Sequence, residues 1–258
     1  MGGAFPDGAR EAMLHIFALG RARVEKDGLP IDSPDLIQKP RELLYYLLSH
    51  PEGKTKEQIG LALWPEASAS QLRSSFHDTV FRLRRALGGK EWVIFEKRRY
   101  AFGGSGGYFY DVGSFEEGVS EARGMRSEAP EEAIGRLREA IDLYAGDFQE
   151  DVAVESEWVL ERQDELRRSY GESLLLLGEL LAAAGRHSEA ADAYRKAISH
   201  DRFLEEAHRG LMRSLVAVGE PGGALRHYEE LARMVQEQLG SSPSNETIAL
   251  YESLRSGE

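Results

Sequence analysis

Residues 75–89 read SFHDTVFRLRRALGG, in which apolar residues recur at helical spacing among three arginines. At about 100° per residue, one side of the predicted helix forms an apolar stripe that we expect to face a core. The stripe consists of Leu72, Phe76, Val80, Leu83 and Leu87. The opposite side, called the outer face below, consists of Ser74, Asp78, Phe81, Arg82 and Arg85, flanked by His77. The stretch therefore predicts an amphipathic helix with a basic, partly apolar outer face.

Two interpretations of the outer face stay open on this helix alone. A helix in the major groove of DNA places apolar side chains against thymine methyl groups and arginines on guanine or phosphate, which suits Phe81 beside Arg82 and Arg85. In the alternative, Arg82 and Arg85 pair with acidic residues of the second half of the chain. Arg84 falls to the side of the outer face and is a weaker candidate than the other two arginines.

The charge of the chain is unevenly distributed along the sequence. The formal net charge is −12, yet residues 1–113 hold 16 basic and 14 acidic residues, whereas residues 114–258 hold 16 and 30. Within residues 73–99 the counts are 8 basic and 3 acidic. The acidity therefore belongs to the second half, and the first half has a basic focus of the kind that binds a polyanion.

The first half predicts a meander of strands followed by two helices. Residues 13–31 predict the strands, with a tight turn at Asp27-Gly28. The first helix has Pro40 at its start and ends before Pro51, and its apolar stripe is Leu43, Leu44, Leu47 and Leu48. The second helix opens with Thr55 and Gln58 at capping-box spacing, and its apolar face is Ile59, Leu61, Leu63 and Trp64.

A third helix and a hairpin complete the first half. Ser68 and Gln71 form a second capping-box pattern, and we expect Gly88 and Gly89 to end the helix in left-handed conformations. Residues 91–110 predict strands, with GGSGG at 103–107 as a hairpin loop, because no helix N-terminus follows it to bind an anion.

This order of elements is that of a winged helix-turn-helix domain. In such domains the third helix enters the major groove, and the hairpin contacts phosphates or the adjacent minor groove. The predicted wing contacts are Lys97, Arg98 and Arg99. We expect Tyr100 and Phe102 to anchor the hairpin on the core.

The second half is predicted to be entirely helical and to contain a repeat. A shift of 34 residues pairs Leu177 with Leu211, Leu181 with Leu215, Gly185 with Gly219, Ala190 with Ala224, and Tyr194 with Tyr228. This period is typical of tetratricopeptide repeats, although ordinary bundle packing is the alternative. Ala133, Leu137 and Ala140 form a weaker copy, and residues 157–172 are expected to lengthen the intervening helix.

Catalytic and membrane patterns are scarce in the sequence. The chain has no cysteine, which excludes disulfides and thiolate zinc sites, and its seven histidines show no HExxH spacing. We therefore predict no enzyme, no cofactor and no metal. No apolar run approaches the roughly 20 residues that span a bilayer, and residues 1–12 predict a flexible lead-in without a signal peptide. The expected location is the cytoplasm.

Several stretches resemble regulators of the antibiotic regulatory protein (SARP) type. They are LALWPEASASQLRSSFHDTVFRLRRALGG, RRYAF and YDVGSFEEGV, followed by the tetratricopeptide-like half, and together they cover residues 13–256. The resemblance implies a response-regulator-like winged helix joined to a bacterial transcriptional activator domain. It also implies phosphate contacts from Trp64, for which core packing is the alternative, and from Lys39 or Arg41. Phe81 departs from the polar residue often found there.

The sequence thus predicts a mainly α protein with small β-sheets, in three parts. Residues 1–12 are the lead-in, 13–113 a winged-helix DNA-binding domain, and 114–258 an all-α tetratricopeptide-like domain. The predicted function is a sequence-specific regulator of transcription, an activator, that binds double-stranded DNA. RNA polymerase or another protein is the expected partner of the helical domain, and a second copy of the chain is a further expected partner.

Two other hypotheses compete with or extend this one. In the first, the chain is a protein-interaction scaffold whose wing domain no longer binds DNA, because acidic concave surfaces favour basic peptides. In the second, the acidic half acts as an intramolecular brake that competes with DNA for the basic half.

Overall fold

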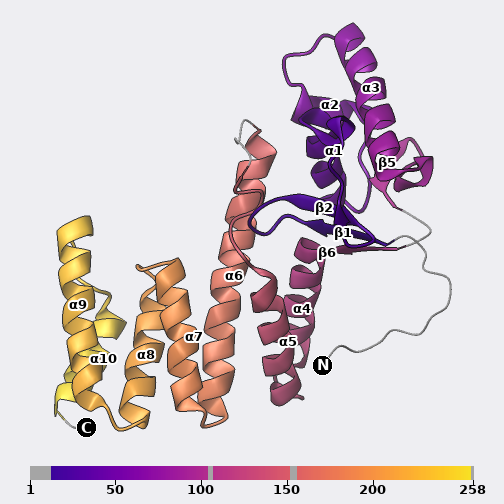
Figure 1. Cartoon of the computed structure of the whole chain (residues 1–258). Coiled ribbons are helices and arrows are strands. Elements are labelled where there is room, and N and C mark those ends of the chain that lie inside the picture. The colour runs from indigo at the N-terminus through magenta and orange to yellow at the C-terminus, as the bar shows by residue number, and fades with distance from the viewer. Residues whose placement is uncertain (1–12, 104–106, 152–155, 257–258) are drawn as a thin grey trace. The chain divides into compact units, whose positions relative to one another are not determined.

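The computed structural model describes residues 13–103, 107–151 and 156–256, so the predicted lead-in at 1–12 lies outside the described residues. The chain divides into two compact units. The first unit comprises Met1–Ser114 together with Ala145–Asp164, and the second comprises Phe115–Tyr144 together with Glu165–Glu258. Figure 1 shows the mixed α/β elements of the first unit and the helical array of the second.

A four-stranded sheet forms one side of the first unit. Its strands are β1 (Leu14–Phe17), β2 (Arg23–Lys26), β3 (Leu29–Pro30) and β6 (Tyr108–Tyr110), in the order β3-β2-β1-β6. The predicted meander is confirmed, and Asp27 and Gly28 at its turn both have positive φ. β6 runs parallel to β1 and belongs to a different sheet from the strand that ends at Phe102, so the predicted hairpin across 103–107 is wrong. Residues 104–106 themselves lie outside the described residues.

Three helices follow the meander, as the sequence predicts. They are α1 (Lys39–Leu48), α2 (Lys56–Leu63) and α3 (Ala69–Leu87), and a 3₁₀ turn, η1 (Pro34–Leu36), precedes α1. Both predicted capping boxes are present, at Thr55 with Gln58 and at Ser68 with Gln71. Each box satisfies N–H groups at a helix start that would otherwise lack a partner.

The end of α3 differs in one detail from the expectation. Gly88 is left-handed with φ +88°, but Gly89 is extended with φ −176°. The N–H of Gly89 bonds to the carbonyl of Arg84 at 3.0 Å, a contact that closes the end of the helix without a second left-handed residue.

The predicted apolar stripe of α1 is confirmed, whereas one residue of the predicted apolar face of α2 is exposed. α1 buries every residue from 43 to 48, because Tyr45 donates its hydroxyl to the Phe17 carbonyl and Tyr46 packs on Trp158. In α2 the buried residues include Ile59 and Leu63, whereas Leu61 is 74% exposed, so its assignment to the apolar face is wrong.

The wing is a two-stranded hairpin made of β4 (Val93–Glu96) and β5 (Arg99–Phe102), preceded by the turn η2 (Lys90–Trp92). The predicted anchors are confirmed. Tyr100 stacks edge-on against Phe76 of α3 at 4.7 Å, and Phe102 stacks on Trp92. Tyr100 also exchanges two backbone hydrogen bonds with Lys54, at 2.7 and 2.9 Å. These contacts fix the wing beside α3.

The segment 145–164 completes the core of the first unit. Phe148 is fully buried and meets Tyr45 edge-on, and the N–H of Gln149 bonds to the carbonyl of Ala18 at 2.7 Å. Nearby, the carboxylate of Asp111 accepts the N–H groups of Ala18 and Leu19. The first unit is therefore assembled from segments far apart in the sequence.

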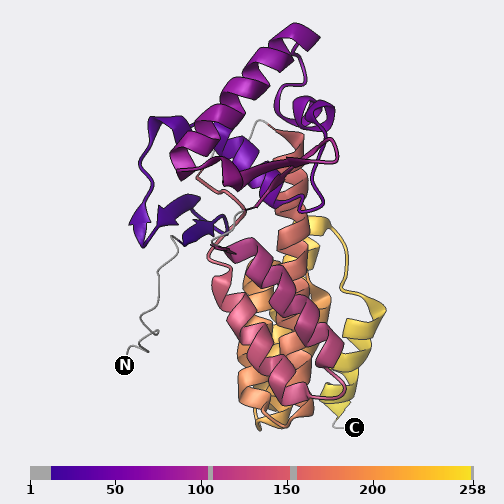
Figure 2. The same ribbon diagram turned by 90° about the vertical axis from the view of Figure 1, so that its right-hand side faces the viewer.

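The second unit consists of antiparallel helix pairs (Figures 1 and 2). The helices that contribute to it are α4 (Asp111–Met125), α5 (Pro130–Leu143), α6 (Glu157–Ala183), α7 (His187–His200), α8 (Glu205–Ala217), α9 (Pro221–Leu239) and α10 (Asn245–Ser256). α4 and α6 begin in the first unit, and the extra turns of α6 include residues 157–172, as the sequence predicts.

The predicted repeat corresponds to the pairs α6/α7 and α8/α9. Gly185 and Gly219 occupy equivalent turns with φ of +75° and +87°, and Ala190 and Ala224 are both fully buried. The paired leucines Leu177, Leu211, Leu181 and Leu215 are all buried. The weaker copy forms α5, where Ala133, Leu137 and Ala140 are buried. These features are those of a tetratricopeptide-like array.

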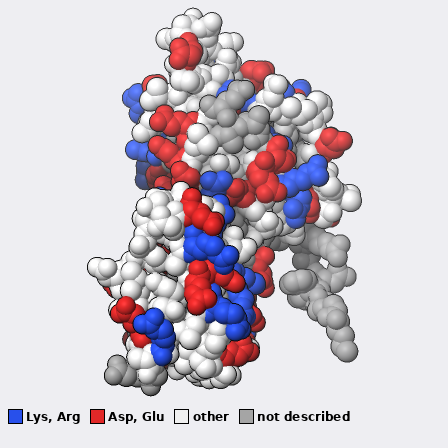
Figure 3. All heavy atoms as spheres, turned by 90° about the vertical axis from the view of Figure 1, so that its left-hand side faces the viewer, with Lys and Arg blue, Asp and Glu red and all other residues white. Residues whose placement is uncertain are grey.

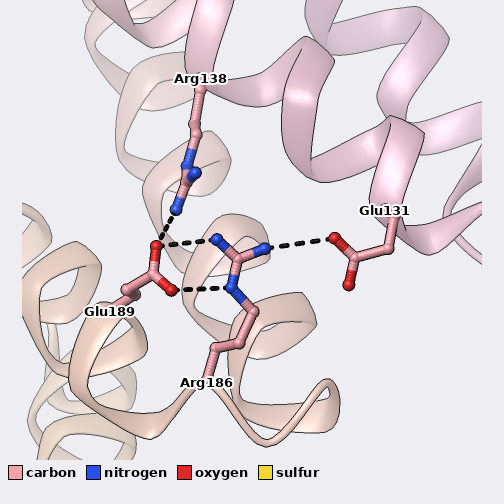
Figure 4. A network of polar contacts seen from close by, with 4 residues as sticks. All are labelled: Glu131, Arg138, Arg186 and Glu189. Atoms are coloured by element: carbon pink, nitrogen blue, oxygen red, sulfur yellow. Dashed lines mark hydrogen bonds and ion pairs between the residues drawn. The ribbon is translucent and has the colours of Figure 1, made fainter.

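Charged side chains link one helix pair to the next on the surface. Arg186 binds Glu189 through two N–H groups at 2.7 and 2.8 Å and reaches Glu131 at 3.2 Å, and Arg138 also binds Glu189 (Figure 4). The hydrogen bonds from Arg186, followed by those from Arg138, lower the pKa of Glu189 to about 2. The network connects α5 to the start of α7, and its exposed ion pairs each add little stability.

Glycines on both sides of Tyr194 set the spacing of α6, α7 and α8. A Cβ at Gly178 would lie 2.6 Å from the Tyr194 ring, and one at Gly210 would lie 2.4 Å from it. We expect Gly178→Ala and Gly210→Ala each to lower the free energy of unfolding by about 1–3 kcal/mol through overpacking. Gly135→Ala is the matched control. Because a Cβ at this position would meet nothing within 4 Å, the variant should raise the free energy of unfolding by about 0.5–1 kcal/mol. Urea denaturation followed by circular dichroism measures the free energy of unfolding of all three variants. Equal effects at the three sites would contradict the packing argument.

Two histidines of the second unit are joined by a hydrogen bond. His208 donates Nε2–H to the Arg202 carbonyl at 3.0 Å, because a carbonyl only accepts, and its Nδ1 then accepts the Nε2–H of His227 at 2.9 Å. Burial, and then the proximity of His208, lowers the pKa of His227 to about 4, and burial lowers the pKa of His208. Both rings are therefore neutral near pH 7.

Protonation should destabilise this pair as the pH falls. The unfolded chain, with a histidine pKa near 6.5, binds more protons than the folded chain between about pH 6.5 and pH 4. We expect the free energy of unfolding to fall by about 1–2 kcal/mol more in the parent than in His227→Gln between pH 7.5 and pH 5. Urea titrations at both pH values measure this difference, and parallel losses in the two proteins would refute it.

Candidate nucleic-acid interface

The outer face of α3 is exposed to solvent, as the helical periodicity predicts. Phe76, Val80, Leu83 and Leu87 are buried, and Leu72 is half-buried. Ser74, His77, Asp78, Phe81 and Arg85 are exposed, and Arg82 is half-buried. Phe81 keeps 60% of its surface exposed. One helix therefore brings together all six predicted side chains of the outer face and its flank.

Both arginines of the outer face are held by the turn η1. The guanidinium of Arg85 binds the carboxylate of Asp35 through Nε and Nη2. Arg82 donates Nη2–H to the carbonyl of Pro34 at 2.8 Å, and its Nε lies 3.6 Å from Asp35. Hydrogen bonding from Arg85, with the charges of both arginines, lowers the pKa of Asp35. The arginines thus pair inside the first unit, and not with the acidic second half that the alternative interpretation named.

Phe81 and Arg85 form a second contact on the outer face. The Arg85 guanidinium carbon lies 5.4 Å from the centroid of the Phe81 ring, within the range of a cation–π interaction. The ring and the carboxylate of Asp35 together restrict the positions that Arg85 can take.

The three predicted wing residues differ in their contacts. Lys97 and Arg98 form the turn of the hairpin with φ of +48° and +64°, and both are exposed. Arg99 donates Nη1–H to the carbonyl of Gly53 at 2.8 Å. Lys97 and Arg98 are therefore the tip, whereas Arg99 also ties the wing to the body of the unit.

Arg84 has a structural contact, in agreement with its position to the side of the outer face. Its Nη2 donates to the carbonyl of Val93, which joins α3 to the wing. The helix carries another exposed arginine, Arg73, which the helical pattern placed on neither the stripe nor the outer face.

Trp64 and Arg41, implied by the family resemblance, lie on other elements. Trp64 is half-buried at the C-terminal end of α2, and Arg41 is half-buried in the first turn of α1. The most important residue that sequence reasoning missed is Asp35, whose contact with Arg85 spans 50 positions. The sequence near Asp35 shows only that this residue follows Ser33 and Pro34, which is a turn pattern.

Metal-binding clusters and membrane-spanning helices are both absent from the described residues. Residues 13–103, 107–151 and 156–256 contain no group of three or more His, Asp or Glu side chains that could hold a metal ion. Within the same ranges, no helix has the length and apolarity needed to cross a membrane.

Comparison with known families defines the class of the protein. The model of the bacterial transcriptional activator domain matches residues 110–255, more than half of the chain. The chain belongs to this family. No curated protein sequence was found to match it.

A solved structure shows the same fold. EmbR of Mycobacterium tuberculosis, solved in complex with a low-affinity phosphopeptide, matches with a TM-score of 0.79 at 21% identity over 96% of this chain. The chain spans 66% of EmbR, slightly less than two thirds. The C-terminal tetratricopeptide domain of a Plasmodium falciparum FK506-binding protein matches at 17% identity, with a TM-score of only 0.41. The match covers 57% of this chain and 89% of that domain's chain. The helical part is thus a bacterial transcriptional activator domain with a tetratricopeptide-like fold, and the predicted family and fold class are confirmed.

The turn of the wing consists of two residues that do not suit its backbone conformation, Lys97 and Arg98. A two-residue hairpin turn with two positive φ values favours Asn-Gly, and non-glycine residues there are strained. We expect Lys97→Asn with Arg98→Gly to raise the free energy of unfolding by about 1 kcal/mol. Lys97→Ala with Arg98→Ala removes the same charges without relieving the backbone and should give no gain. Thermal denaturation compares the two, and equal stabilities would show that the turn is unstrained.

Proposed function

We propose that this regulator binds double-stranded DNA in a sequence-specific manner through the outer face of α3 and the wing. The observation that carries the proposal is the exposure of Phe81 beside Arg85 on a helix that is otherwise regularly amphipathic. A solvated helix gains nothing from a large exposed ring, whereas a helix in the major groove can place that ring on thymine methyl groups.

Each residue of the proposed interface has a stated role. Ser74, His77 and Asp78 contact base edges from the first half of α3, and Arg82 and Arg85 contact bases or phosphates from the second half. Lys97, Arg98 and Arg99 bind phosphates beside the groove. Trp64 and Arg41 add phosphate contacts, in keeping with the family resemblance. The domain that binds DNA is proposed to be residues 13–113.

The helical part has a proposed role of its own. Residues 114–258 would contact RNA polymerase or another protein, or a second copy of the chain, and so activate transcription in the cytoplasm without a cofactor. On the face shown in Figure 3, acidic and basic side chains are interspersed and do not form the field of one sign that the scaffold alternative expects.

Salt dependence tests the proposed role of the arginines. We expect Arg82→Ala with Arg85→Ala to weaken binding of the full chain to duplex DNA. The slope of log affinity against log salt should flatten by about 0.9 for each phosphate ion pair removed. Fluorescence anisotropy with a labelled random duplex at several salt concentrations measures both quantities.

Arg136→Ala with Arg195→Ala is the matched control, because these exposed arginines of α5 and α7 carry the same charge. It should leave the slope unchanged. If the α3 variant bound DNA like the parent, or if the control flattened the slope equally, the assignment of α3 would fail.

A further inference from the structure

Asp35 is held in place independently of the arginines that it binds. The hydroxyl of Ser33 accepts the N–H of Asp35 at 3.2 Å, and the N–H of Leu36 bonds to the Ser33 carbonyl at 2.9 Å. Leu36 is buried, which anchors η1 in the core. The carboxylate of Asp35 keeps only 15% of its side-chain surface exposed. It is therefore a fixed partner of α3 and differs from a mobile surface charge.

The same carboxylate occupies the positions that a phosphate would take. Arg85 uses Nε and Nη2 on Asp35, the edge through which an arginine binds phosphate with two parallel hydrogen bonds. Arg82 is committed to the Pro34 carbonyl and lies close to the same carboxylate. A DNA phosphate could bind this edge of Arg85 only by displacing Asp35, and it would be repelled by the Asp35 charge while approaching.

The part of the Arg85 guanidinium that points away from η1 remains available to contact DNA. Five N–H groups are present on an arginine, and the bidentate contact uses two of them. The Phe81 ring lies against the same guanidinium, so Arg85 is restricted on two sides. A guanidinium that is fixed in this way is preorganised to donate to a base edge, where geometry discriminates between bases.

We propose that Asp35 is a specificity-determining residue of DNA binding. It withholds Arg85 from phosphates, which carry no sequence information, and orients the Arg85 guanidinium toward bases. The proposal rests on the DNA binding proposed above. Removing the carboxylate should convert binding that depends on sequence into binding that does not.

The test compares Asp35→Asn with the parent as full chains. A duplex selected from a random pool by the parent serves as the specific site, and a random duplex as the non-specific one. We expect Asp35→Asn to bind the random duplex more tightly and to steepen its salt slope by about 0.9 for each additional phosphate bound. The ratio of specific to non-specific affinity should fall about tenfold, the effect of removing roughly one base-specific interaction. Asp32→Asn removes the same charge three residues away, at an exposed position, and should keep the ratio of the parent.

Two further variants separate this role from a structural one. In the background of Arg82→Ala with Arg85→Ala, Asp35→Asn should no longer change the ratio, because no arginine is left to release. Asp35→Glu keeps the charge and should retain most of the ratio. If Asp35→Asn fails to fold by circular dichroism, Asp35→Ser replaces it, since serine also suits a 3₁₀ turn.

The possible results are distinct. An unchanged ratio and slope in Asp35→Asn, with DNA still bound, would overturn the proposal, as would a parallel loss of both affinities. An effect that persists without the two arginines would overturn it too. Failure of the parent itself to bind any duplex would instead refute the DNA-binding function on which the proposal rests.

Discussion

One aromatic contact, that between Phe76 and Tyr100, ties the apolar stripe of α3 to the wing. Phe76 is fully buried, and the Tyr100 ring meets it edge-on at 4.7 Å. Tyr100 in turn bonds through its backbone to Lys54, just before α2. Burial of the apolar stripe thus fixes the rotation of α3 about its axis, and the exposed face follows from that rotation. Since Arg84 adds a hydrogen bond to Val93, helix and wing are held as one rigid surface.

Features that depend on near neighbours in the chain could be predicted from the sequence, whereas features that depend on distant segments could not. The capping box at Ser68 and the buried stripe of α3 were predictable, because caps and helical periodicity act over three or four residues. The pairing of Asp35 with Arg85 and the parallel pairing of β6 with β1 were not. Both join segments more than 45 residues apart, and no local pattern encodes such a partner.

Electrostatics in this chain has to be considered within each unit, and the net charge of −12 is a poor guide to binding. At physiological salt, exposed charges separated by more than about 8 Å are largely screened. The charges that act on α3 are therefore its immediate neighbours, of which Asp35 is one. In the second unit, many arginines are already paired, as with Arg123 on Glu172 and Arg136 on Glu121. A large acidic excess and a basic binding surface can coexist in one chain for this reason.

Two departures from locally favourable sequence lie on α3 and the wing of the first unit. Among the described residues with positive φ that are not glycine, Lys97 and Arg98 are the only consecutive pair, and asparagine and glycine would suit both positions better. Phe81 is exposed where a polar residue would be more soluble. A folded chain retains such exceptions when they serve another purpose, because each lowers stability without improving packing. Since the strained turn and the exposed ring lie on the two elements that a winged helix applies to DNA, the exceptions support the same site as the charges do, on independent physical grounds.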